Sequence, residues 1–131
     1  LIVQYNTSRR MQTKEILPYP IQLSRDRVTD ENSRVRLLEP THLALNFPHQ
    51  ITPKDFEGWV QERGLYFADN WDAKLTPLLG MNDEGESEKL GSLLVANHGK
   101  GKVVYTGLSF FRELPAGVPG AYRLLLNLIA L

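Results

Sequence analysis

Apolar residues fall in short runs that are separated by long polar stretches. Residues 1–5 are apolar and partly β-branched, which predicts a buried strand. Near the C-terminus, SLLVAN and KVVYTG are nearly continuous in apolar residues and are separated by HGKG, whose glycines suit a tight turn. This arrangement predicts a β-hairpin that is covered on both faces.

One internal segment, ITPKDFEGWVQERG, has the start and stop signals of a helix. Thr52 fits the N-cap, Pro53 the first helical position, and Asp55 the third, from which its carboxylate can reach the Thr52 amide. Gly64 would end this helix. Its buried face at i, i+3 and i+4 would contain Phe56, Trp59 and Val60.

The C-terminal segment GAYRLLLNLIAL predicts a second, substantially buried helix. Its apolar stripe contains Ala121, Leu124, Leu125 and Leu128, widened by Leu126 and Ile129. Residues 35–38 and 65–68 are shorter strand candidates, whereas LSRDRVTDENSR predicts an exposed excursion. Strands and helices in this order indicate an α/β fold with a mixed sheet.

Composition narrows the possible functions. The length of 131 residues suits one domain, and fifteen basic residues balance fifteen acidic ones, so we expect no nucleic-acid partner. The absence of cysteine excludes disulfides, thiolate catalysis and Cys-containing metal sites. The three histidines, His42, His49 and His98, lack metal-ligand spacing, so we expect neither a metal nor a cofactor.

Several stretches resemble a known group of proteins. HGKGKVVYTGLSFF and LNFPHQITPKDFEGWVQERGLYFADNW resemble parts of ThuA-like domains, which belong to the class I glutamine amidotransferase-like group. DFEGWVQERGLYF and SFFRELPAGVPGAYRLLLNLIAL together resemble the C-terminal region of large bacterial proteins of the LmbE/PIG-L deacetylase type. The resemblance covers most of residues 35–131.

This resemblance implies a flavodoxin-like, three-layer domain. Residues 1–131 would be its C-terminal half, with the first half and a zinc-dependent deacetylase domain upstream of Leu1. The implied context is the processing of N-acetylated sugar conjugates, and the implied location is periplasmic or secreted. In the resembling amidotransferases a catalytic Cys follows the strand that matches residues 1–5. Because this chain has no Cys, glutaminase chemistry is excluded.

The ends of the first and last predicted strands carry candidate ligand-binding residues, because open α/β sheets bind ligands at the carboxyl ends of their strands. Tyr5, Asn6 and Thr7 follow the first strand; Arg112 and Glu113 follow the last. An Arg fork suits a carboxylate or phosphate, and the loop LPAGVPG could present amides to an anion before the final helix. The alternatives are a structural ion pair and a simple chain turn.

The stretch ERGLYF borders the cleft in the resembling domains, which adds Glu62 and Tyr66 to the candidate ligand-binding set. Glu62 could equally pair with Arg63 or with a neighbouring loop. No catalytic residue is predicted.

Three functions therefore remain open. The first is a non-catalytic accessory domain of an N-acetyl-sugar deacetylase that binds a small polar or sugar ligand. The second is a ThuA-like sugar-processing enzyme without a Cys nucleophile. The third is a structural domain that self-associates as a homodimer.

Overall fold

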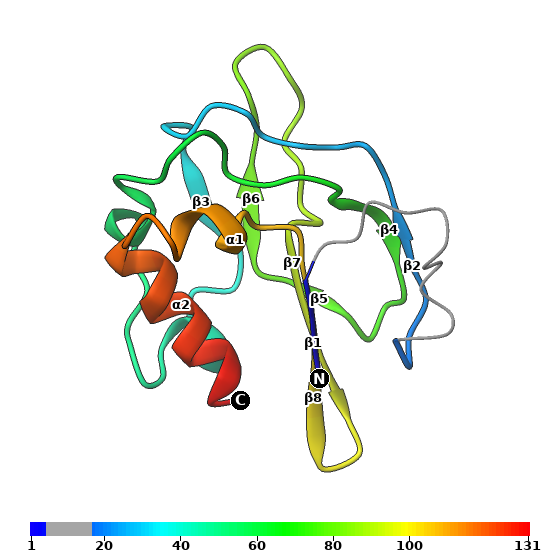
Figure 1. The fold of residues 1–131 in the computed structure, drawn as a ribbon. Helices are drawn as coiled ribbons and strands as arrows, with labels where there is room; N and C mark the ends of the chain where they lie inside the picture. The colour runs from blue at the N-terminus through cyan, green and yellow to red at the C-terminus, as the bar shows by residue number, and fades with distance from the viewer. Residues whose placement is uncertain (5–16) are drawn as a thin grey trace.

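The computed structural model describes residues 1–4 and 17–131 (Figure 1). The predicted site residues Tyr5, Asn6 and Thr7 lie outside the described residues. The elements, in chain order, are β1 (Ile2–Gln4), β2 (Ile21–Leu23), β3 (Val35–Leu37), the 3₁₀ helices η2 (Leu43–Leu45) and η3 (Pro53–Phe56), β4 (Ala68–Trp71), β5 (Thr76–Pro77), β6 (Leu79–Met81), β7 (Leu93–His98), β8 (Gly101–Thr106), α1 (Phe110–Glu113) and α2 (Pro119–Ile129).

A mixed four-stranded sheet with the order β1-β8-β7-β5 forms the centre of the molecule. β1 runs parallel to β8, whereas β7 and β8 form the predicted antiparallel hairpin, in which His98 pairs with Gly101. Gly99 in the turn has a φ of +57°, a conformation that glycine adopts without a steric penalty. The mixed α/β fold is thus confirmed, and the finer flavodoxin-like arrangement stays a prediction.

Both faces of the hairpin are covered, as the apolar runs predicted. Successive side chains of a strand point to opposite faces of the sheet, and here they enter two separate hydrophobic clusters. Leu93, Val95 and Val104 join the cluster that includes α2, and Leu94, Val103 and Tyr105 join the cluster that includes β2 and β4. Figure 1 shows the sheet between these two layers, with the hairpin turn projecting beyond them.

The first strand forms where it was predicted, but it is less buried than expected. Leu1 is 62% exposed and Ile2 is 36% exposed. Within the part of the chain that the structure describes, β1 is the last strand of its sheet and pairs only with β8. Its position at this edge explains the exposure.

The prediction of a long helix after Thr52 is wrong beyond Phe56. The Asp55 carboxylate accepts a hydrogen bond from the Thr52 amide at 2.8 Å, so the predicted cap is present. The backbone then becomes extended at Glu57, with φ −74° and ψ 145°. Gly58 and Gln61 follow with positive φ angles of 72° and 68°, which no helix accommodates. Trp59 is buried as predicted, whereas Val60 is 39% exposed.

The strand predicted at residues 65–68 is displaced, because β4 begins only at Ala68. The preceding residues lie against the segment after β8 instead, and the Leu65 amide donates to the Gly107 carbonyl at 2.8 Å. The predicted exposed excursion also contains a core residue: Val28 is fully buried and forms a bridge with Gly64.

The final helix is present, but only one side of it is buried. Ala121, Leu124 and Leu128 are buried, whereas Leu126 and Ile129 are 49% and 65% exposed. The two exposed residues lie on the side of α2 that faces away from the sheet, so the predicted widening of the buried stripe is wrong. Across the described residues, no helix has the length and apolarity needed to cross a bilayer.

Candidate functional site

Three of the predicted site residues come together after β8. The Arg112 Nε donates to Glu62 Oε1 at 2.7 Å, and this ion pair is partly exposed, with 37% of the Arg112 side chain and 11% of the Glu62 side chain accessible. Glu113 interacts electrostatically with both. The structural alternative for Arg112, an ion pair, is therefore present, and a ligand-binding role for these residues stays a prediction.

Glu113 holds the neighbouring loop in place. Its side chain is fully buried, and Oε2 accepts a hydrogen bond from the Val60 amide at 2.9 Å. Oε1 is buried and lacks a hydrogen-bond partner among the described residues. Burial raises the pKa of Glu113, and the hydrogen bond from Val60 and the charge of Arg63 oppose this rise. The geometry makes Glu113 an internal anchor of residues 57–62.

Arg63 is a second buried anchor, which the sequence did not single out as structural. Nε and Nη2 donate to the Ser33 carbonyl at 3.2 and 2.7 Å, and Nη1 donates to the Phe56 carbonyl. The guanidinium lies 5.8 Å from the centre of the Trp59 ring. Burial lowers the pKa of Arg63, which the nearby acidic charges oppose.

Tyr66 is held through its backbone. It has a positive φ of 54°, and its carbonyl accepts a hydrogen bond from the Tyr105 hydroxyl at 2.5 Å. Burial raises the pKa of Tyr105. The structure therefore gives Tyr66 a role in connecting the 62–67 segment to β8.

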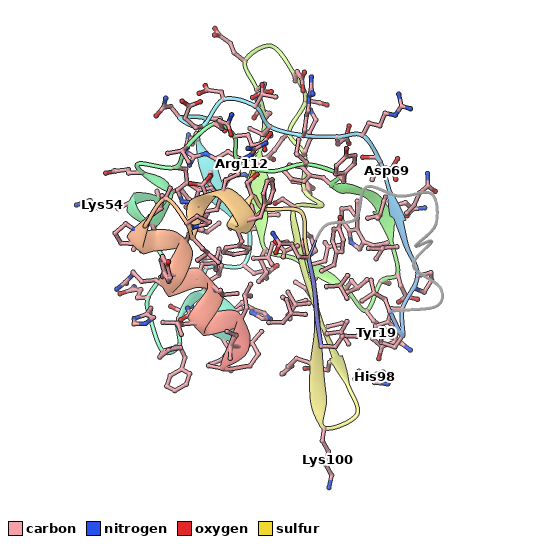
Figure 2. All side chains as sticks on the ribbon, in the orientation of Figure 1. Tyr19, Lys54, Asp69, His98, Lys100 and Arg112 are labelled. Carbon is pink, nitrogen blue, oxygen red and sulfur yellow. The ribbon has the colours of Figure 1, made fainter. Side chains whose placement is uncertain are left out.

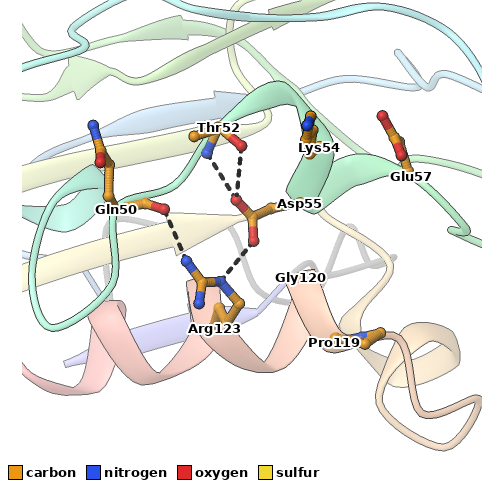
Figure 3. Close-up of a pocket in the computed structure, with 8 residues that line it drawn as sticks. All are labelled: Gln50, Thr52, Lys54, Asp55, Glu57, Pro119, Gly120 and Arg123. Atoms are coloured by element: carbon orange, nitrogen blue, oxygen red, sulfur yellow. Dashed lines mark hydrogen bonds and ion pairs between the residues drawn. The ribbon is translucent and has the colours of Figure 1, made fainter.

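A pocket of about 520 Å³ lies between η3 and the N-terminal half of α2 (Figure 3). This volume is within the range of about 300–1,000 Å³ that is typical of small-molecule sites. The lining residues are Gln50, Thr52, Lys54, Asp55, Glu57, Pro119, Gly120 and Arg123. The pocket includes the end of the LPAGVPG loop, and it is our candidate functional site.

An internal hydrogen-bond network fixes the walls of this pocket. Asp55 Oδ1 accepts from Arg123 Nε at 2.7 Å, and Asp55 Oδ2 accepts from the Thr52 amide at 2.8 Å. Arg123 Nη2 also donates to the Gln50 carbonyl at 2.9 Å. These bonds, drawn in Figure 3, join α2 to η3 and to the chain just before it.

The close approach of η3 and α2 depends on a glycine. A Cβ atom at Gly120 would lie 1.8 Å from the Asp55 carbonyl oxygen, far inside any acceptable contact. Since neither backbone can move without breaking the Arg123 network, Gly120 sets the distance between the two helices.

Two further lining side chains are available for a ligand. Lys54 and Glu57 are both exposed, and neither forms an ion pair within the described part of the chain. Figure 3 shows Lys54 on η3 and Glu57 on the extended chain that follows it. The pocket thus offers free hydrogen-bond donors and acceptors on fixed walls, which suits recognition of a polar molecule.

The sequence did not reveal most of this pocket. Asp55 was predicted as a capping residue, but its partner Arg123 lies 68 residues away, and no local pattern connects the two. The LPAGVPG loop was the only signal that pointed here. Among residues 1–4 and 17–131, no group of three or more His, Asp or Glu side chains could hold a metal ion.

Comparisons of the chain with protein-family models, with curated proteins and with solved structures found no match.

Proposed function

We propose that this chain is a non-catalytic domain that binds a small polar ligand of the carbohydrate type. The observation that carries this proposal is the pocket between η3 and α2, whose polar walls are fixed by the Asp55–Arg123 network. Sugar hydroxyls both donate and accept hydrogen bonds, so they suit a lining that contains the ammonium of Lys54 and the carboxylate of Glu57.

The pocket supports binding rather than covalent catalysis. Its lining contains neither Cys nor His, and its one hydroxyl, on Thr52, points to the same Asp55 carboxylate that Arg123 already holds. That carboxylate accepts from the Thr52 amide at 2.8 Å and from Arg123 at 2.7 Å, so we interpret the Thr52–Asp55 contact as part of the pocket wall and not as a nucleophile with its base. The groups left for a polar ligand are therefore hydrogen-bonding groups, which favours binding.

The wider context of the domain is also a proposal. The sequence resemblance supports an accessory role beside a PIG-L/LmbE-type deacetylase domain in the same polypeptide. A His-x-Asp-Asp motif encoded upstream of Leu1 would support that context, and an upstream region without a deacetylase would remove it.

Self-association is a second candidate function, favoured by one observation. Tyr122, Leu126 and Ile129 recur at i, i+4 and i+7 on α2, and all three are 46–65% exposed. Apolar residues on the outer side of a helix often mark a contact surface. Analytical ultracentrifugation would show a concentration-dependent dimer that Leu126→Glu abolishes; a monomer at all concentrations would exclude this function.

Isothermal calorimetry with glucose tests the binding proposal. Lys54→Ala and Glu57→Ala remove the two available polar groups, and each should weaken glucose binding several-fold. The matched controls are Lys100→Ala at the hairpin turn, which Figure 2 shows far from Lys54, and Glu84→Ala in another exposed loop. The proposal fails if the wild-type chain binds no glucose, or if the control variants weaken binding as much.

A further inference from the structure

The charges around the pocket cancel. Its lining contains two cationic side chains, Lys54 and Arg123, and two anionic ones, Asp55 and Glu57. A site for a phosphorylated or otherwise anionic ligand normally has an excess of cations, often with an Arg fork directed at the anion. The lining of this pocket has no such excess.

The Nε–Nη2 edge of Arg123 is already occupied and cannot serve as an anion-binding fork. Its Nε is bonded to Asp55 Oδ1 at 2.7 Å and its Nη2 to the Gln50 carbonyl at 2.9 Å. The carboxylate of Asp55 therefore neutralises the guanidinium, and both groups serve the wall of the pocket. Lys54 and Glu57 are left as the charged groups that a ligand can use.

The start of α2 is also a poor anion site, which favours the simple chain turn that the sequence left open for the LPAGVPG loop. Helix N-termini bind anions through unpaired amides of the first turn. Here the first helical residue is Pro119, which has no N–H, and the Ala121 and Tyr122 amides donate to the Val118 carbonyl at 3.2 and 3.4 Å. The first turn thus lacks the cluster of free amides that a phosphate needs.

We infer that the pocket selects an uncharged polyhydroxylated ligand over its phosphorylated counterpart, and that Lys54 and Glu57 set this selectivity. This inference rests on the proposed function, because it concerns the same pocket. The hydroxyls of an uncharged ligand can accept from Lys54 and donate to Glu57, whereas a phosphate in the pocket meets both charges. The repulsion from Glu57 offsets the attraction to Lys54.

Changing one charge at a time tests the inference. The probes are glucose and glucose 6-phosphate, titrated at low ionic strength, and the readout is the ratio of their affinities for each variant. The wild-type chain should prefer glucose. Glu57→Gln, which keeps the hydrogen-bonding shape and removes the negative charge, should shift the ratio about fivefold toward glucose 6-phosphate. Lys54→Gln should shift it in the opposite direction.

Glu84→Gln and Lys100→Gln make the same charge changes elsewhere on the surface, and they should leave the ratio unchanged. The inference is overturned if the wild-type chain binds glucose 6-phosphate as tightly as glucose, or if Glu57→Gln shifts the ratio no more than Glu84→Gln does. Absence of binding to both sugars overturns the proposed function itself and the inference with it. The two failures are therefore distinguishable.

Discussion

At the scale of single residues, Glu113 is a buried carboxyl whose burial disfavours its charged form. Burial raises the pKa of this carboxyl above its ordinary value of 4.5. When a folded-state pKa is raised, the associated stability is fully present below the unfolded-state pKa and is lost as the pH rises through the folded-state value. The chain should therefore lose part of its stability above about pH 4.5 through this group.

Glu113→Gln should remove that pH dependence. The glutamine carbonyl can still accept the hydrogen bond from the Val60 amide but carries no charge to bury. Urea unfolding at a series of pH values should show the free energies of unfolding of the wild-type and variant chains diverging as the pH rises, in favour of the variant. Parallel curves would show that Glu113 ionisation is not linked to folding.

His42 should show the opposite pH dependence. Burial lowers the pKa of His42 from 6.5, and the charge of Lys102 lowers it further. Its Nδ1 accepts a hydrogen bond from the Ala44 amide at 3.1 Å at the start of η2, and protonation would remove this acceptor. The associated stability is present above pH 6.5 and is lost as the pH falls through the folded-state pKa.

His42→Asn tests this dependence, because Asn is also a good N-cap residue but does not titrate in this range. In thermal unfolding, the melting temperature of the wild-type chain should fall relative to that of the variant as the pH is lowered from about 8 to about 5. If the difference between the two chains stays constant over this range, His42 does not titrate in the way that its surroundings predict.

At the scale of elements, the junction between η3 and α2 is the feature that positions the pocket. Gly120→Ala would place a Cβ atom 1.8 Å from the Asp55 carbonyl oxygen and force the two helices apart. We expect this variant to lower the free energy of unfolding by more than about 2 kcal/mol. Denaturant titration measures this change, and the same variant should lose glucose binding.

Gly85→Ala is the matched control for that prediction. Gly85 lies in a loop where no atom is within 4 Å of its Cβ position, so an alanine there is disfavoured only by the φ of +77°. Backbone strain of this kind costs about 1 kcal/mol. Equal losses in the two variants would mean that close contact at Gly120 does not hold the junction together.

Sequence patterns predicted the elements whose structure is set by residues close together in the chain. The hairpin followed from two apolar runs around HGKG, and the cap at Thr52 from the position of Asp55. The helix expected after Asp55 failed, because buried Phe56 and Trp59 matched helical spacing while the backbone turned at Gly58 and Gln61. Both rings are therefore buried without a helix between them, with their centres 5.5 Å apart.

At the scale of the whole molecule, the sequence predicted little of the candidate site. The sequence predicted Glu62, Arg112 and Glu113 as site residues, and they do lie together. In the structure they form a network that fixes the loop between η3 and β4. The pocket needs Asp55 and Arg123, which come together only when α2 packs on η3. Only the three-dimensional structure could reveal contacts between residues so far apart in the chain.

The most direct test of the central claim is an NMR titration of the ¹⁵N-labelled chain with glucose, with the sugar followed in the same sample. The account predicts amide shifts concentrated at Gln50, Asp55 and Gly120, around the pocket, while the glucose remains chemically unchanged. Absence of shifts, shifts centred on Arg112 instead, or consumption of the glucose would contradict it.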